Sequence, residues 1–214
     1  MGAPHKVIEP ICIAPVTTEK PKSMRWKRYG LTFLLAALLL TVSVGGYAWY
    51  VMKSHNFHVV SAGQVYRSAQ LDPASLARLV HENGIKTVIN LRGGNWAADW
   101  YYAETNAAKQ LGLTHIDIHL SAGDELTNEQ MENVLNVIAH APKPVLIHCK
   151  NGADRTGLIS ALYLYTVDGK SAKTADRELT MLRGHIPYLF FRDTIAMDNS
   201  FWRYVEAHGR AGKQ

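Results

Sequence analysis

The chain has 214 residues, of which 47% are hydrophobic and 19% are charged, a composition that suits one globular domain with an additional apolar segment. Two cysteines exclude a disulfide-rich scaffold, and no Cys-x-x-Cys pair is present to suggest a zinc ribbon or a thioredoxin-like site. The formal net charge of +5 is concentrated in residues 1–29, so a nucleic-acid-binding face on the rest of the chain is not expected.

The segment after the basic tail is apolar and long. Residues 30–52 hold no formally charged side chain, and a helix of that length reaches about 35 Å, enough to cross a hydrocarbon core of about 30 Å. Aromatic residues lie at both ends of the segment, as they do at the two interfaces of a membrane. Five basic residues precede it and only Lys53 follows closely, so the positive-inside rule places the N-terminus in the cytoplasm.

These patterns predict three parts of the chain. Residues 1–29 are expected to form a basic, disordered cytoplasmic tail, residues 30–52 a transmembrane helix, and residues 55–210 a domain on the far side of the membrane. We expect a bacterial inner-membrane protein with this domain in the periplasm. A cleaved signal peptide is the alternative, because Gly46-Tyr47-Ala48 supplies small residues at a plausible cleavage site, but the long basic and apolar regions favour a retained anchor.

The remaining residues alternate between two periodicities. Val- and Ile-rich segments predict strands at 57–60, 64–67, 86–91, 114–120 and 144–148. Helices are expected at 73–83, 99–111, 127–140, 156–167, 171–183 and 194–208. The clearest helix starts are Asp72-Pro73, an N-cap followed by proline, and the capping box between Thr127 and Gln130. Such alternation predicts an α/β domain whose mainly parallel central sheet is flanked by helices.

One loop carries the chemistry. The strand at 144–148 ends at His148, Cys149 follows, and a helix begins near Arg155. A loop that wraps onto a helix N-terminus directs backbone N–H groups at one point and forms an anion cradle, and Gly152 can adopt the dihedrals that this requires. The amide dipoles and Arg155 favour the thiolate of Cys149, and a guanidinium can hold two phosphoryl oxygens. This arrangement predicts covalent phosphoryl transfer.

The motif His148-Cys149-x5-Arg155-Thr156 resembles the loop of the cysteine-dependent phosphatase superfamily, in its dual-specificity branch. The segments Val65–Gln70 and Thr87–Arg92 fall in the expected order, and the resemblance covers about residues 57–208. It implies a dual-specificity phosphatase-like fold, a phosphocysteine formed on Cys149, and no need for a metal or cofactor. It also implies that Thr156 hydrogen-bonds the Cys149 sulfur and that His148 fixes the loop. The groups that would bind the phosphoryl oxygens are Arg155 and the amides of Lys150, Asn151, Gly152, Ala153, Asp154 and Arg155.

Such an enzyme needs an acid to protonate the leaving oxygen. Asp124 is the first candidate, because it stands beside Gly123 on a loop after the 114–120 strand and before the cysteine. Asp154, inside the cradle, is the alternative. Lys150 and Arg92 are expected at the rim of the pocket, where a basic residue after the nucleophile resembles the loops of phospholipid phosphatases.

Other interpretations of these residues are weaker. Cys149 could be a small buried hydrophobe, but that leaves Gly152 and Arg155 unexplained. His115, Asp117 and His119 could hold a metal on one face of a strand, but strand alternation explains the pattern and no metal site is expected.

The leading functional hypothesis is a membrane-tethered phosphatase acting on phosphotyrosine, phosphoserine or phosphothreonine in proteins. The alternatives are a phospholipid or phosphoinositide phosphatase of the same superfamily, a non-catalytic module that binds phosphorylated partners, and sulfur transfer through a cysteine persulfide. The expected partners are therefore a phosphorylated protein or phospholipid and the membrane, and no nucleic acid.

Overall fold

The computed structural model describes residues 23–188 and 192–209, so most of the predicted cytoplasmic tail lies outside the described residues. The chain divides into two units, residues 1–46 and residues 47–214. The second unit holds the predicted α/β domain and all of the candidate site residues.

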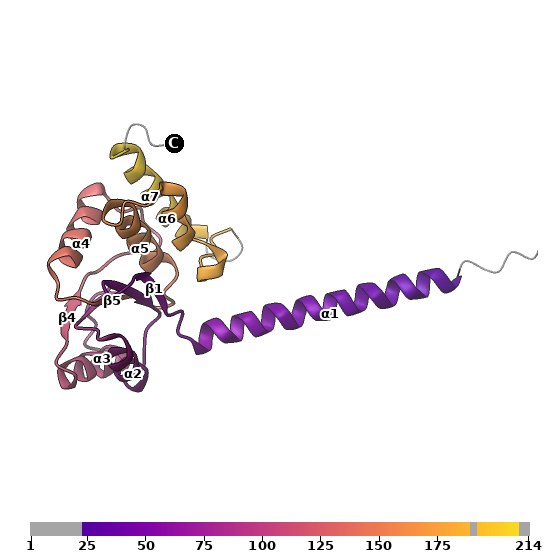
Figure 1. The fold of residues 1–214 in the computed structure, drawn as a ribbon, viewed down its shortest axis with the longest axis horizontal. Coiled ribbons are helices and arrows are strands. Elements are labelled where there is room, and N and C mark those ends of the chain that lie inside the picture. Colours follow the sequence, from indigo (N-terminus) through magenta and orange to yellow (C-terminus); the bar gives the residue numbers. More distant parts are fainter. Residues whose placement is uncertain (1–22, 189–191, 210–214) are drawn as a thin grey trace, which may run out of the picture. The chain divides into compact units, whose positions relative to one another are not determined.

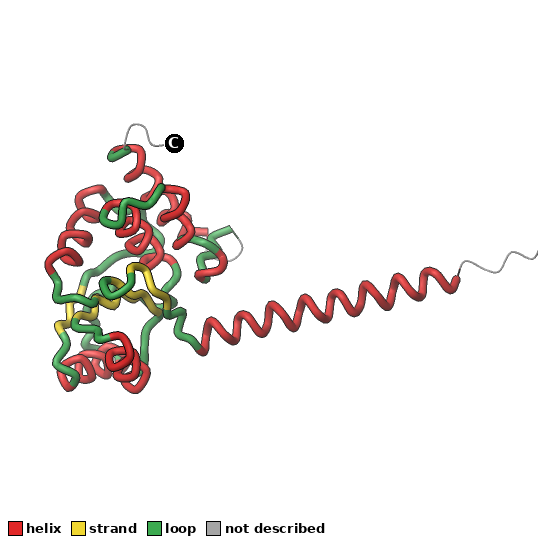
Figure 2. Tube along the Cα trace, viewed as in Figure 1, coloured by secondary structure: helices red, strands yellow, loops and turns green. Residues whose placement is uncertain are grey.

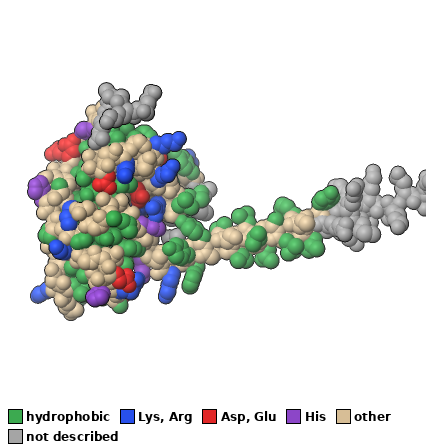
Figure 3. Space-filling model, in the orientation of Figure 1, with side chains coloured by type: hydrophobic (Ala, Val, Ile, Leu, Met, Phe, Trp, Pro, Cys, Tyr) green, Lys and Arg blue, Asp and Glu red, His purple; other side chains and the backbone are tan. Residues whose placement is uncertain are grey.

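The predicted membrane segment is helical. Helix α1 spans Ser23–Lys53, and its stretch Tyr29–Tyr47 is long and apolar enough to cross a membrane by length and composition. A signal sequence meets the same two criteria. The described side chains of this stretch are exposed, and Figure 3 shows hydrophobic side chains along it.

A five-stranded sheet forms the centre of the domain, with the order β1-β2-β5-β3-β4. Strand β1 pairs antiparallel with β2, and the other pairs are parallel. The three central strands are buried along their whole length, as expected of parallel strands covered on both faces. The α/β fold with a mainly parallel sheet is thus confirmed. The strands are β1 (His58–Ser61), β2 (Val65–Ser68), β3 (Thr87–Asn90), β4 (Thr114–Asp117) and β5 (Val145–His148).

Helices cover both faces of this sheet (Figures 1 and 2). Helices α2 (Pro73–Asn83) and α3 (Asp99–Gln110) lie on one face. The other face carries α4 (Asn128–His140), α5 (Asp154–Thr166), α6 (Ala172–Ala175) and α7 (Ile195–Ala207). Three short 3₁₀ turns complete the second layer, η1 (Asp176–Glu178), η2 (Met181–Arg183) and η3 (Arg192–Thr194).

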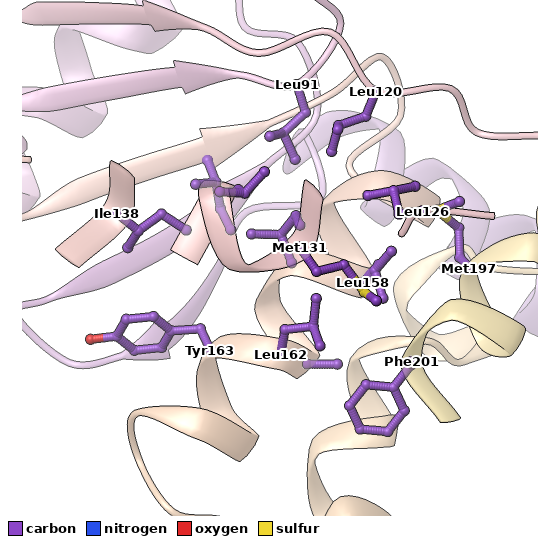
Figure 4. Close-up of a cluster of buried hydrophobic side chains, with 14 of the residues drawn as sticks. Leu91, Leu120, Leu126, Met131, Ile138, Leu158, Leu162, Tyr163, Met197 and Phe201 are labelled. Carbon is purple, nitrogen blue, oxygen red and sulfur yellow. The ribbon is translucent and has the colours of Figure 1, made fainter. Parts of the chain in front are cut away.

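Two hydrophobic clusters hold these layers together. The larger one lies between the sheet and helices α4, α5 and α7, and Figure 4 labels Leu91, Leu120, Leu126, Met131, Ile138, Leu158, Leu162, Tyr163, Met197 and Phe201 from it. The smaller one lies under α2 and α3 and contains Tyr66, Leu71, Leu76, Leu79, Ile85, Val88, Ala107 and Leu146. Helix α5 is buried along most of its length, so the loop that precedes it stands on a rigid support.

Local start and stop signals position two of the helices as predicted. The Asp72 side chain accepts a hydrogen bond from the Ser75 amide at the start of α2, and Gly84 ends that helix with φ +64°. At the start of α4 both hydrogen bonds of the capping box between Thr127 and Gln130 form.

The predicted helix at 171–183 is wrong. Only Ala172–Ala175 is α-helical, and two 3₁₀ turns follow. The carbonyl oxygen of Glu178 accepts a hydrogen bond from the Arg67 side chain, and a Cβ on Gly157 would lie 2.8 Å from the same oxygen. Because this carbonyl is drawn toward β2 and α5, it does not serve as the acceptor that a continuing helix would need.

Candidate active site

The candidate loop lies at the carboxyl edge of the sheet. Residues 149–153 connect the end of β5 to the start of α5. Ser68, Asn90 and His148 are aligned in register at the ends of β2, β3 and β5, so the segments that follow these three strands meet around the loop. In open α/β sheets this edge is where ligands bind.

Gly152 sets the path of this loop. Its φ of +65° is a left-handed conformation that side chains disfavour. A Cβ at this position would lie 2.5 Å from the backbone of Ser68 and Ala69, so the loop can pack against the end of β2 only with glycine here. The amide of Gln70 donates to the carbonyl oxygen of Lys150 and adds a second connection between the two segments.

A buried arginine holds the loop from behind. Arg67 on β2 is 0% exposed, and its guanidinium donates to the carbonyl oxygens of Gly152, at 2.5 Å, and Ala153, at 3.3 Å. The same guanidinium pairs with the Glu178 carboxylate, with 2.5 Å between Nη1 and Oε2. Since C=O and N–H groups point in opposite directions across a trans peptide, the amides of Ala153 and Asp154 face away from Arg67. Asn56 also donates to two carbonyl oxygens of the loop, those of Asn151 and Gly152.

Cys149 is buried at the start of the loop. Arg155 and Thr156, in the first turn of α5, each have a buried polar atom without a hydrogen-bond partner. The Arg155 guanidinium donates to the Leu120 carbonyl oxygen at 3.2 Å, but its buried Nε has no hydrogen-bond partner. The buried hydroxyls of Thr156 and Ser68 have none either, so the expected hydrogen bond between Thr156 and the Cys149 sulfur is not formed in this structure. Buried donors without partners are costly unless a ligand satisfies them.

His148 is fixed by a carboxylate that the sequence analysis missed. Its Nε2 donates to Glu104 on α3 at 3.1 Å, and its Nδ1 lies 3.4 Å from the carbonyl oxygen of Cys149. Burial would raise the pKa of Glu104, but hydrogen bonds from His115 and His148 outweigh burial and lower it to about 2. Gln70 also donates to this carboxylate. Glu104 therefore stays ionised and holds the residue before Cys149 in one orientation.

Arg92 lies close enough to the loop to interact with it electrostatically. Burial, followed by the positive charge of Arg155, lowers the pKa of Arg92, while Cys149 acts in the opposite direction. Its guanidinium donates to the Gln70 side chain at 2.9 Å and stands 3.5 Å from the centre of the Trp100 ring. Lys150 and Asn151 are exposed on the loop itself.

The two candidate acids have different surroundings. Asp124 is exposed on the loop between β4 and α4. Asp154 accepts a hydrogen bond at 2.7 Å from His185, whose other ring nitrogen bonds Asp198 on α7 at 2.8 Å. Burial would lower the pKa of His185, but the two carboxylates outweigh it and raise it to about 9. Asp154 is therefore paired with a cation near neutral pH.

The three possible metal ligands on β4 and beyond have separate partners. His115 bonds Glu104, Asp117 accepts from Asn90 and Tyr101, and His119 lies 3.1 Å from the carbonyl oxygen of Arg92. Across the described residues, no group of three or more His, Cys, Asp and Glu side chains is placed to hold a metal ion.

The residues that sequence reasoning missed are supports of the loop, namely Asn56, Arg67, Glu104 and His185. One signal was available for Arg67, since a charged residue within a strand that is otherwise suited to burial needs a partner in the core. The partners of Glu104 and His185 are distant in sequence and carry no local pattern.

The chain matches known phosphatases. Residues 49–186 match the family described as DSP-PTPase phosphatase fused to NAD+ kinase. The dual specificity protein phosphatase TpbA of Pseudomonas aeruginosa is 30% identical over 169 residues, which cover 73% of this chain and 72% of that protein.

Solved structures agree. A crystal structure of P. aeruginosa TpbA superposes with a TM-score of 0.54 at 25% identity and covers 72% of this chain and 92% of that one. A second TpbA structure, in complex with pTyr, gives a TM-score of 0.52 at 24% identity and covers 71% and 91%. Together with the fold, these matches show that the chain belongs to the DSP-PTPase family and is a cysteine-dependent phosphatase of the dual-specificity type.

Proposed function

We propose that Cys149 is the nucleophile of this phosphatase. Its thiolate attacks phosphorus, the bond from phosphorus to the leaving oxygen breaks, and a phosphocysteine forms. Water then attacks that phosphorus, releasing inorganic phosphate and restoring the thiolate. The observation that carries this proposal is the unpaired, buried Nε of Arg155 next to a loop whose carbonyl oxygens are held by Arg67. Arg155 and the loop amides would bind the phosphoryl oxygens.

Asp124 is the proposed general acid, which donates a proton to the leaving oxygen in the first step. Its exposure leaves the carboxyl free to approach a bound substrate. Asp154 suits this role less well, because its carboxylate is bonded to the His185 ring and a proton on it would compete with that ion pair.

The proposed substrates are phosphorylated proteins, with phosphotyrosine as the first candidate. The support is the relative TpbA, which is named a dual specificity protein phosphatase and has been crystallised in complex with pTyr. We propose further that residues 30–52 anchor the domain of residues 55–210 to the outer side of a bacterial inner membrane. An anchor would raise the effective concentration of substrates at the bilayer.

A phospholipid or phosphoinositide substrate is the second candidate. Lys150 is exposed directly after Cys149, where a cation would meet a second anionic group beside the phosphate that is cleaved. A peptide whose only anionic group is the cleaved phosphate offers Lys150 no such contact.

Turnover by the purified full chain in detergent tests both candidates. The panel consists of phosphotyrosine, phosphoserine and phosphothreonine peptides and of phospholipids whose headgroup carries a phosphate monoester, with release of inorganic phosphate as the readout. We expect Cys149→Ser and Arg155→Lys to lower kcat/KM by at least about 10³-fold on every substrate that is cleaved. Activity that survives Cys149→Ser would contradict the proposed chemistry, whereas a preference for lipid would overturn only the substrate class.

The general acid is tested with leaving groups of different strength. We expect Asp124→Asn to lower kcat on a phosphoserine peptide by about 10²–10⁴-fold, because its alkoxide leaves poorly without a proton. Hydrolysis of an aryl phosphate with an acidic phenol should change much less. Asp154→Asn is the matched variant, and a larger leaving-group dependence for that variant than for Asp124→Asn would transfer the role to Asp154.

A further inference from the structure

The segment Met181–Tyr188, which begins with η2, exposes large apolar side chains. Met181, Leu182 and Tyr188 are 63%, 69% and 78% exposed, while His185 and Pro187 between them are buried. The same segment borders an apolar cavity of about 240 Å³. Exposed apolar side chains clustered in one short segment mark a contact surface rather than chance exposure.

This segment contacts Tyr47, the first residue of the second unit. The hydroxyl of Tyr47 donates to the carbonyl oxygen of Leu182 at 2.5 Å, and Tyr47 is the last residue of the candidate membrane span. Trp49 and Tyr50, which follow, are exposed. Tyrosine and tryptophan at the end of a span lie at the level of the lipid headgroups. A chain segment hydrogen-bonded to Tyr47 lies at the same level.

We propose that Met181, Leu182, Tyr188, Trp49 and Tyr50 form an interfacial patch that inserts into the headgroup region of a lipid bilayer. The proposal rests on the retained anchor of the proposed function. A bilayer is favoured as the occupant because Tyr47 places the patch at its surface. Exposed Lys53 and Arg192 flank the two segments and complement anionic headgroups.

The patch is joined to the catalytic loop by side-chain hydrogen bonds. Asn56 Nδ2 donates to the carbonyl oxygens of both Gly152, in the loop, and Arg183, next to Leu182. His185 bonds Asp154 at the start of α5. Contact of the patch with lipid would therefore hold the catalytic loop at a fixed height above the bilayer. At that height the loop could reach phosphates attached to membrane components.

A fluorophore placed in the patch tests the contact. The full chain with Cys12→Ser, Cys149→Ser and Leu182→Cys carries one thiol, which is labelled with the environment-sensitive dye NBD. The protein is reconstituted into vesicles of phosphatidylethanolamine and phosphatidylglycerol. The matched control is Val167→Cys, since Val167 is an apolar residue 56% exposed at the opposite end of α5 from Asp154. A second patch variant, Met181→Cys, guards against a local effect of labelling.

We expect NBD emission at 182 and 181 to shift to shorter wavelength and to be quenched several-fold more strongly by nitroxide-labelled lipids than at 167. Equal spectra and quenching at all three positions, in chains that resist alkaline carbonate extraction, would overturn the patch and leave the anchor intact. Release of the chain by carbonate would overturn both. A shift that disappears when the protein is diluted in excess lipid would show that a second copy covers the patch, and would also overturn the proposal.

Discussion

Gly152 shows how strongly a single residue constrains the loop. Alanine here would adopt a strained left-handed conformation, and its Cβ would meet the backbone of Ser68 and Ala69 at 2.5 Å. Gly63 offers a matched control, because its φ is +69° but no atom lies within 4 Å of an added Cβ. We expect Gly63→Ala to lower the free energy of unfolding by about 1 kcal/mol and to leave kcat/KM unchanged.

Gly152→Ala should lower both the free energy of unfolding and kcat/KM more than Gly63→Ala does. The loop must move away from β2, and a displacement of about 1 Å in a catalytic group can lower the rate by about 10²-fold. The measurements are kcat/KM on an aryl phosphate and the melting temperature of the full chain in detergent. Equal effects of the two glycine variants would show that the contact with Ser68 does not set the geometry of the loop.

His185 makes the stability of the domain depend on pH. The ring is enclosed by Asp154 of α5 and Asp198 of α7, with Asp176 of η1 near Asp198. Its folded pKa of about 9 is above the value of 6.5 for an unperturbed histidine. The proton is therefore bound more tightly in the folded state. Its stabilisation is complete below pH 6.5 and is lost as the pH rises through 9.

Replacement of this ring by an amide removes that dependence. We expect His185→Gln to lower the free energy of unfolding by at most about 3 kcal/mol below pH 6.5, an upper value because the histidine and its two carboxylates titrate together. The two melting temperatures should approach each other above about pH 9. A gap between wild type and variant that stays constant across this range would contradict a charged His185.

At the level of elements, the buried pair of Arg67 and Glu178 connects β2 to the segment after α6. Removing one partner of a buried pair leaves the other charge uncompensated, which costs about 3–5 kcal/mol. We expect Glu178→Gln to have an effect of this size in thermal or urea unfolding. Glu82→Gln is the control, because the Arg78–Glu82 pair is exposed on α2, and its loss should cost about 0.5 kcal/mol or less. Similar costs for both variants would mean that Arg67 finds other partners.

The contact between Arg67 and Glu178 also shows which helices could be predicted from local sequence and which could not. Helices α2 and α4 were predicted at their N-termini because Asp72 and Thr127 act on amides three residues away. The segment at 171–183 was predicted as one helix because its local pattern is helical, but Arg67, more than a hundred residues earlier, takes the carbonyl of Glu178. Propensity is a weak prior that such tertiary contacts override.

The candidate site likewise contains residues that local sequence predicts and residues that it does not. Cys149, Gly152 and Arg155 lie within seven consecutive residues, so their spacing alone indicates an anion-binding loop. The groups that hold this loop come from the segment before β1, from β2 and α3, and from the segment after η2. Their convergence depends on strand order and register, which place β5 between β2 and β3, and no periodicity in the sequence encodes that order.

At the scale of the whole molecule, the distribution of charge specifies the expected topology. The basic residues before the apolar segment are Lys20, Lys22, Arg25, Lys27 and Arg28. Basic residues near a span are retained in the cytoplasm, so a C-terminal tag on the full chain is expected outside it. Externally added protease should remove this tag from spheroplasts of a bacterial host without lysis. The chain should keep its full mass if the segment is an anchor and lose its N-terminus if it is a signal peptide.

The decisive variant exchanges the charge bias across the span. Replacing the five basic residues by glutamine, and inserting three lysines directly after Lys53, moves the positive charge to the other end of the segment and keeps Asn56, which supports the loop. We expect a large fraction of the chains to insert in the opposite orientation, so that the tag becomes protected in spheroplasts and is cleaved only after lysis. Glutamine replacement of five basic residues within the domain is the control for the change in net charge, and should leave the tag accessible. If the tag of the wild-type chain were already protected, the proposed periplasmic location would be wrong, although the chemistry of the loop would be unaffected.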